Sequence, residues 1–290
     1  MSKSANGLES FTPLRFATEG WPCGSTPASA PGTHSLPIRV DRLTSNSHDE
    51  VANAAVFRSN PRIERVPLEN GESCYVVDDA LHEPERFVEW AAARREEFRA
   101  VDFNAYPGTY RMMPAAVETA LQDFFHRHMR GFFDARRLLK MHCRLSMVTL
   151  PPAALRPYQW LCHTDRYGLD SSQSIQASVL YLFKDPDLGG TSFYAPKRSR
   201  EETAQLFADT TTLSNDEFST RYGIEPGYMR DSNAYFERVG GVPARWNRLI
   251  FYDGSFLHSG DIAAPERLSE DPSVGRLTFN GFFISRRHAT

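Results

Sequence analysis

Three side chains in the second half of the chain have the types and the order of a metal-binding set. His163 and Asp165 are separated by one residue, and His258 follows far downstream. Two imidazoles and one carboxylate on one face of a metal are typical of non-haem Fe(II) sites, which keep other positions open for a co-substrate and O2. Arg276 comes later in the chain, and a guanidinium binds a carboxylate through two parallel charge-assisted hydrogen bonds. The set predicts iron chemistry with a carboxylate-bearing co-substrate such as 2-oxoglutarate.

Short strands are expected to carry these residues. β-branched and aromatic runs alternate with turn signals such as Gly189-Gly190. The expected strands cover residues 74–77, 145–150, 174–183, 191–194, 248–252 and 277–284. Helical spacing of apolar residues predicts two helices, near 83–98 and from Pro114 to about Lys140. We therefore expect a mostly β protein of the α+β class, with N-terminal helices that flank the β core.

The strand period of two indicates how the metal ligands are presented. His163 and Asp165 are two residues apart, so on a strand both point to the same face and can bind one metal. His258 can reach that face from a neighbouring strand. Each residue alone is most often an ordinary polar residue. Their combination, in this order and within the β half, favours a metal site.

The last expected strand presents a second polar set. Arg276, Thr278 and Asn280 alternate along it, so all three are expected to point inward. A buried Arg276 needs an anion, because an unpaired buried charge is costly. The distal carboxylate of 2-oxoglutarate would supply it, with the Thr278 hydroxyl and the Tyr181 hydroxyl of the facing strand as further contacts.

The chain is expected to contain one folded domain and an arm. Residues 1–65 include a stretch rich in Pro, Gly and Ser, which is typical of an extended or partly disordered arm. Residues 66–290 are expected to form the domain. An insertion at 197–241 interrupts its strands and is a candidate lid. Within it, Ser214 and Glu217 fit a capping box and Gly223 a C-cap, which predicts a helix at 215–222.

Composition narrows the classes of partner and compartment. The net charge is −3 over 290 residues, so no global electrostatic attraction to nucleic acid or to an anionic membrane is expected. There is no apolar run long enough to span a bilayer and no signal-peptide pattern. The four cysteines have no metal-binding spacing and are expected to be free thiols. A cytoplasmic location is expected, and the oligomeric state is left open.

At these residues the chain resembles the Fe(II)/2-oxoglutarate oxygenase superfamily, and within it the prolyl-4-hydroxylase-like branch. It is also similar to an uncharacterised bacterial group of that superfamily. The resemblance covers about residues 143–285, and more loosely the expected strand and helix start at 74–98. The matching motifs are His163-Thr164-Asp165, Tyr181-Leu182-Phe183, Asp185-Pro186-Asp187, Gly189-Gly190-Thr191-Ser192-Phe193, Trp246-Asn247-Arg248-Leu249-Ile250-Phe251 before His258, and Arg276-Leu277-Thr278.

The resemblance implies a double-stranded β-helix (jelly-roll) core. It implies that His163, Asp165 and His258 bind iron. It also implies that Arg276 and Thr278, assisted by Tyr181, bind 2-oxoglutarate. The chain departs from the branch where Phe183 replaces the usual Asn and in the long insertion at 197–241. The substrate side of the site therefore need not follow the prolyl hydroxylases.

The predicted activity is that of an Fe(II)- and 2-oxoglutarate-dependent dioxygenase. It would hydroxylate an unactivated C–H of a small molecule, an amino acid or a peptide side chain, and release succinate and CO2. The candidate substrate contacts are Arg166, Trp160, Tyr252 and Asn280. Desaturation or ring formation would use the same ligands. Two alternatives stay open: a cupin-like metal-dependent oxygenase or isomerase that does not use 2-oxoglutarate, and a non-catalytic ligand-binding barrel.

Overall fold

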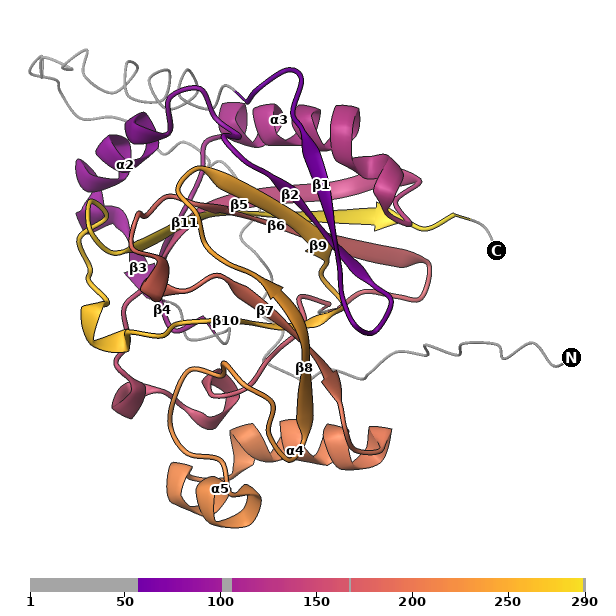
Figure 1. The fold of residues 1–290 in the computed structure, drawn as a ribbon, viewed down its shortest axis with the longest axis vertical. Coiled ribbons are helices and arrows are strands. Elements are labelled where there is room, and N and C mark those ends of the chain that lie inside the picture. The colour runs from indigo at the N-terminus through magenta and orange to yellow at the C-terminus, as the bar shows by residue number, and fades with distance from the viewer. Residues whose placement is uncertain (1–56, 101–105, 167, 289–290) are drawn as a thin grey trace, which may run out of the picture.

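The computed structural model describes residues 57–100, 106–166 and 168–288, and two antiparallel sheets make up most of this part (Figure 1). The larger sheet has eight strands in the order β1-β2-β9-β6-β11-β5-β4-β3, and the smaller has three in the order β10-β7-β8. The larger sheet contains β1 (Ile63–Pro67), β2 (Ser73–Val77), β3 (Arg99–Ala100), β4 (Gly108–Met112), β5 (Arg137–Val148), β6 (Gln173–Tyr181), β9 (Arg248–Asp253) and β11 (Arg276–Arg286). The smaller contains β7 (Thr191–Pro196), β8 (Phe236–Val242) and β10 (Leu257–Gly260). A mostly β protein with a few helices was predicted, and this is confirmed.

The large sheet has one apolar face and one polar face, and the side chains of its central strand β11 alternate between them. Phe279 is fully buried in the main core cluster. Arg276, Thr278 and Asn280 instead line a cavity between the two sheets. Successive side chains on a strand point to opposite faces, so the predicted inward alternation of the three polar residues is confirmed.

Helices cover the apolar face of the large sheet. The helix α2 (Pro84–Ala92) contributes Phe87 to the main core cluster, and α3 (Ala115–Phe124) contributes Leu121. The ring centroids of Phe87 and Phe279 lie 5.4 Å apart. In Figure 1, α3 lies across the sheet on the side away from α4 and α5. The helices therefore pack on one face of the large sheet, and its polar face lies toward the small sheet.

The predicted end of the second helix is wrong. After α3 the chain forms a π-helical turn at Phe125–Met129 and a 3-10 turn at Arg130–Phe132, and it enters β5 at Arg137. The spacing of apolar residues continues through Phe132, which explains the longer prediction. The last four residues of the predicted helix, 137–140, are nevertheless in a strand, because β5 pairs with β11 from end to end. Long-range pairing here outweighs local helical periodicity.

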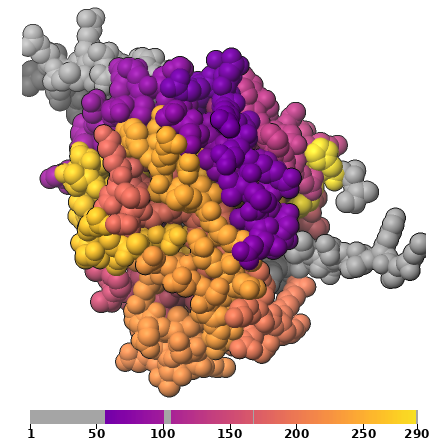
Figure 2. Space-filling model, in the orientation of Figure 1, coloured from indigo at the N-terminus to yellow at the C-terminus, as the bar shows by residue number. Residues whose placement is uncertain are grey.

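The segment 197–241 contains two helices that form a lobe at one end of the molecule (Figure 2). They are α4 (Arg200–Thr212) and α5 (Asn215–Tyr222). The predicted helix at 215–222 is confirmed, with Ser214 accepting a hydrogen bond from the backbone N–H of Glu217 and Gly223 in the left-handed region at φ 63°. The sequence interpretation missed α4, although its start has the same capping box.

Most of the predicted arm lies outside the described residues, which begin at Phe57. The large sheet starts with β1 at Ile63, ahead of the expected domain boundary at residue 66. Among the described helices, none combines the length and the hydropathy needed to cross a bilayer.

Candidate metal centre

The three predicted metal ligands converge at one end of the cavity. His258 lies on β10, and the backbone N–H of each of His163 and His258 donates to the other's carbonyl at 2.9 Å. The backbone N–H of Asp165 donates to the Gly254 carbonyl at 2.7 Å. One ligand atom from each side chain lies within 4.8 Å of the other two. His163 and Asp165 lie in a loop before β6 rather than on a strand. Their backbone hydrogen bonds to His258 and Gly254, and not strand alternation, therefore place both side chains at the same site.

Hydrogen bonding prepares His258 to act as a ligand through Nε2. Its Nδ1 is 2.9 Å from the Phe256 carbonyl, which can only accept, so the proton resides on Nδ1. Nε2 then presents a lone pair and faces Asp165 Oδ2 at 3.5 Å. That carboxylate oxygen is buried and has no hydrogen-bond partner among the described residues. An orphaned buried oxygen beside an imidazole lone pair fits a bound cation.

Burial shifts the pKa values of two of the three ligands, His163 and Asp165. Burial raises the pKa of Asp165, although the neighbouring His258 and Arg144 oppose this. Burial, followed by His258 and Arg144, lowers the pKa of His163 to about 3. Solvent reaches His163 through the cavity, while protein atoms surround its ring on the other sides. The imidazole of His163 is therefore neutral at physiological pH, which is the form that binds metals.

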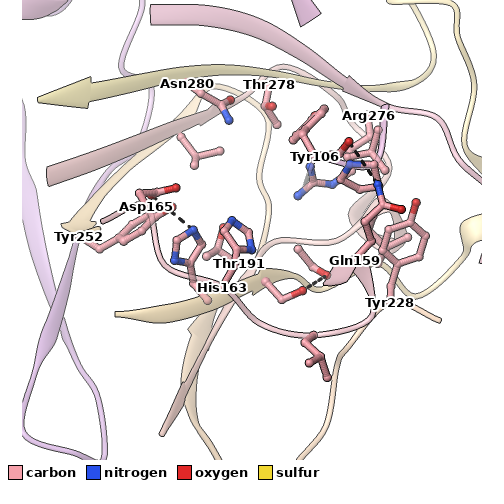
Figure 3. A pocket seen from close by; sticks show the side chains of 18 of the residues that line it. Tyr106, Gln159, His163, Asp165, Thr191, Tyr228, Tyr252, Arg276, Thr278 and Asn280 are labelled. Carbon is pink, nitrogen blue, oxygen red and sulfur yellow. Dashed lines mark hydrogen bonds and ion pairs between the residues drawn. The ribbon is translucent and has the colours of Figure 1, made fainter. Parts of the chain in front are cut away.

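Arg276 lies across the cavity from the metal ligands (Figure 3). Its Nε donates to the Leu188 carbonyl at 2.7 Å, and its Nη2 lies 3.2 Å from the carbonyls of Gly189 and Gly190. We expected this buried side chain to need an anion for its hydrogen bonds. Three backbone carbonyls instead accept from it, because the double-glycine turn brings the chain against its guanidinium. A Cβ on Gly190 would lie 2.0 Å from the Val242 oxygen, so a glycine is required there.

The other predicted co-substrate residues are placed differently from one another. Thr278 lines the cavity and is almost fully buried, with its Oγ1 3.4 Å from the Ser146 carbonyl. Tyr181 is fully buried, and its hydroxyl is hydrogen-bonded to Thr191 Oγ1 at 2.9 Å. Thr191 itself lines the cavity. Tyr181 therefore reaches the cavity through Thr191, and its role at a co-substrate stays a prediction.

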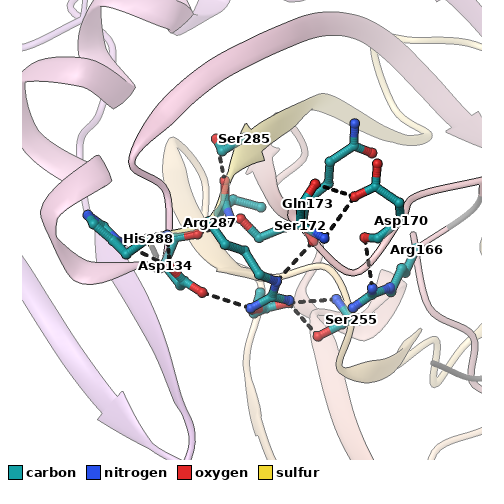
Figure 4. A network of polar contacts seen from close by, with 12 residues as sticks. Asp134, Arg166, Asp170, Ser172, Gln173, Ser255, Ser285, Arg287 and His288 are labelled. Carbon is teal, nitrogen blue, oxygen red and sulfur yellow. Dashed lines mark hydrogen bonds and ion pairs between the residues drawn. The ribbon is translucent and has the colours of Figure 1, made fainter. Parts of the chain in front are cut away.

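Two of the four candidate substrate residues line the cavity and two do not. Tyr252 and Asn280 line the cavity. Trp160 does not: it is 2% exposed and packs edge-on against Phe218 of α5, in a core cluster beneath the lobe. Arg166 is also absent from the cavity lining, and its Nη2 donates to the Asp170 carbonyl in the surface network of Figure 4. Both residues were predicted because they are close to the metal ligands in sequence, and neither lines the cavity.

Several residues that the sequence interpretation missed line the same cavity. They are Tyr106, Arg144, Gln159 and Tyr228. Strand alternation could have indicated Arg144, because Cys143, Leu145 and Met147 are buried in the main core while the intervening residues face the other way. The expected strand was begun one residue too late to include it. Tyr106 and Tyr228 lie in loops and Gln159 ends a single 3-10 turn, so no periodicity could indicate these three.

Comparisons with known proteins give a family and remote structural likenesses. No curated protein matches the chain significantly. The nogalamycin-biosynthesis carbocyclase SnoK, described as non-haem and α-ketoglutarate-dependent, is 13% identical with a TM-score of 0.43, over 87% of each chain. HygX from Streptomyces hygroscopicus, solved with nickel and 2-oxoglutarate, is 12% identical with a TM-score of 0.38, over 74% of this chain and 84% of HygX.

An N-substituted L-amino acid dioxygenase from Burkholderia ambifaria is 11% identical with a TM-score of 0.34, over 80% of this chain and 96% of that enzyme. Likenesses of this size do not assign an activity. The family model is more extensive, because it matches residues 59–283 and so spans both sheets and the metal ligands. The chain belongs to the group described as Family of unknown function (DUF6445).

Proposed function

We propose that this protein is an Fe(II)- and 2-oxoglutarate-dependent oxygenase that hydroxylates a C–H bond and releases succinate and CO2. One observation carries the proposal: two imidazoles and a carboxylate converge within 4.8 Å in a cavity that also holds a buried guanidinium. The ligand set is the one that non-haem iron oxygenases use.

Each residue has a distinct part in this proposal. His163, Asp165 and His258 would hold iron, which together with 2-oxoglutarate and O2 supplies the oxidising chemistry. Arg276, fixed by three carbonyls, would hold the distal carboxylate of the co-substrate through its remaining donors. Thr278 would add a hydroxyl contact. The double-stranded β-helix core implied by the sequence resemblance belongs to the same proposal.

The lobe is proposed to act as the lid over this site. Its segment 197–241 supplies Tyr228 to the cavity lining, and the Tyr228 hydroxyl donates to the Leu150 carbonyl at 2.6 Å. Phe218 of the lobe also packs on Trp160, and Trp160 is close in sequence to the metal ligands His163 and Asp165. A lid at this place would exclude water from the reacting atoms. The substrate is proposed to be a small molecule or a peptide side chain.

Anaerobic titration with Fe(II) and then 2-oxoglutarate tests the proposal. Chelation of iron by the keto acid gives a weak visible charge-transfer band, which His163→Ala should abolish and Arg276→Leu should weaken. Arg137→Gln is a matched control, because Arg137 is an exposed arginine at the far end of β5. Metal binding without any band would remove 2-oxoglutarate from the proposal. Absence of metal binding would remove the oxygenase altogether.

One observation favours a second candidate, a cupin-like metal-dependent oxygenase or isomerase that does not use 2-oxoglutarate. Nε and Nη2 of Arg276 already donate to backbone carbonyls, so its hydrogen bonds do not require a bound carboxylate. Under this alternative Arg276 is a structural clamp on the glycine turn. Loss of Arg276 would then lower stability and leave the affinity for metal unchanged.

A further inference from the structure

A second arginine, Arg144, lines the cavity from the strand beside β11. Its Cα pairs with that of Asn280, and both side chains line the cavity with the metal ligands. The same cavity is lined by His163, Asp165 and His258. The cation therefore lies near the reaction centre, on the wall where a substrate would have to sit.

Arg144 has no anionic partner in the described part of the chain. None of the ion pairs found there includes it, and its Nε is buried without a hydrogen-bond partner. The side-chain oxygen of Asn280, its neighbour on β11, is also buried without a partner. Buried polar groups are normally satisfied. Two orphaned groups on one wall of a cavity point to a ligand that is polar at this end.

Three aromatic rings hold the guanidinium in place. Its Cζ lies 4.5 Å from the ring centroid of Tyr110, 5.1 Å from that of Phe282 and 5.4 Å from that of Tyr106. Arginine stacks on aromatic faces and keeps its edge donors free for a planar anion. No carboxylate among the described residues pairs with this cation, and backbone carbonyls accept from Nε and Nη2 of Arg276 instead. A guanidinium placed in this way is suited to bind a planar anion.

Resting on the function proposed above, we propose that Arg144 binds a carboxylate of the substrate, so that the enzyme acts on a carboxylic acid. Arg276 of β11 pairs with Val148 of β5, whereas Arg144 of β5 pairs with Asn280 of β11, four residues further along β11. A residue rise of ~3.4 Å separates these backbone positions by about 14 Å. 2-Oxoglutarate has one distal carboxylate, and one guanidinium suffices to bind it. Arg276 takes the co-substrate, and Arg144 remains for the substrate.

A carboxylate fits this site better than a phosphate does. A single guanidinium offers a fork of two parallel N–H donors, which matches one carboxylate. A phosphate dianion needs more donors and more positive charge than one arginine and one amide supply. The aromatic rings beside Arg144 would also contact apolar carbons next to the carboxylate. Asn280 would accept an N–H or O–H from the same substrate.

Binding of matched acids and amides tests the proposal. The probes are monocarboxylic acids, aliphatic, aromatic and N-acyl amino acids, each beside its uncharged primary amide. Thermal shift and calorimetry would follow their binding to the Ni(II)- and 2-oxoglutarate-loaded protein, and to the metal-free protein in parallel. We expect acids to bind, amides to bind at least about tenfold more weakly, and Arg144→Gln to abolish the difference. Arg144→Lys should restore part of it, and Arg137→Gln, on the same strand, should leave it intact.

The outcomes separate this inference from the proposed function. Equal binding of acids and amides, or no binding of any acid, overturns the role of Arg144. Loss of the Fe(II)/2-oxoglutarate band in Arg144→Gln with the band retained in Arg276→Leu also overturns it, because Arg144 would then hold the co-substrate. If wild type gives no band, the proposed function fails. The metal-free wild type and Arg144→Gln would still show whether Arg144 discriminates acids from amides.

Discussion

Asp165→Asn should stabilise the metal-free protein and abolish its response to metal. The Asp165 side chain is 13% exposed, and its Oδ2 has no hydrogen-bond partner in the described structure. An amide of the same shape can donate to His258 Nε2, which lies 3.5 Å from that position and presents a lone pair. An unsatisfied buried acceptor costs about 1–3 kcal/mol. The charge of Arg144 offsets part of this, so we expect a gain near the lower end.

The response to metal should move in the opposite direction. A ligand at 100 times its Kd stabilises the folded state by about 2.7 kcal/mol. For a domain of this size that corresponds to a rise in Tm of about 5–10 °C. Wild type should show this rise with Ni(II), whereas Asp165→Asn should show little, because it lacks the anionic ligand. The two proteins should therefore exchange their order of stability when metal is added.

Urea unfolding in EDTA, and thermal scans with and without Ni(II), would measure both effects. Asp231→Asn is the control, because it removes an exposed carboxylate outside the site and should change neither quantity. A metal-free Asp165→Asn protein that is less stable than wild type by 1 kcal/mol or more would refute the reasoning about the orphaned oxygen. An equal metal-induced rise in both proteins would refute the ligand assignment.

Three further outcomes follow from contacts outside the metal ligands. Gly190→Ala, with its Cβ 2.0 Å from a backbone oxygen, should lose several kcal/mol (about 2–4) in chemical unfolding, whereas Gly227→Ala, with open space around it, should change stability by less than about 1 kcal/mol. Arg248 holds the pKa of Asp78 below its ordinary value of 3.8. The ionised carboxylate therefore stabilises the fold above pH 3.8, and this contribution is lost as the pH falls through the lowered pKa. Asp78→Asn should remove this pH dependence of the unfolding free energy, by less than about 1 kcal/mol because the pair is partly exposed. Tyr181→Phe should cost about 1 kcal/mol in unfolding free energy and weaken 2-oxoglutarate binding, measured by the charge-transfer band, less than Arg276→Leu does.

Local patterns in the sequence were enough to predict the parts of this protein that depend on neighbours along the chain. Alternation on β11 placed Arg276, Thr278 and Asn280 on one face, and the capping box at Ser214 marked the start of α5. Caps and strand faces are set by residues two to four positions apart, so a single sequence contains them. The residue types and order of the metal ligands likewise indicated a site before any geometry was known.

Contacts between distant segments decided the rest. The bridge between His163 and His258 joins the loop before β6 to strand β10, and no local period predicts it. Pairing with β11 drew residues up to Lys140 into a strand against their helical spacing. Trp160 belongs to the core because the lobe folds over it. Whether Arg276 and Arg144 are satisfied or free depends on which backbone and rings surround each guanidinium, and only the packing of the two sheets determines that.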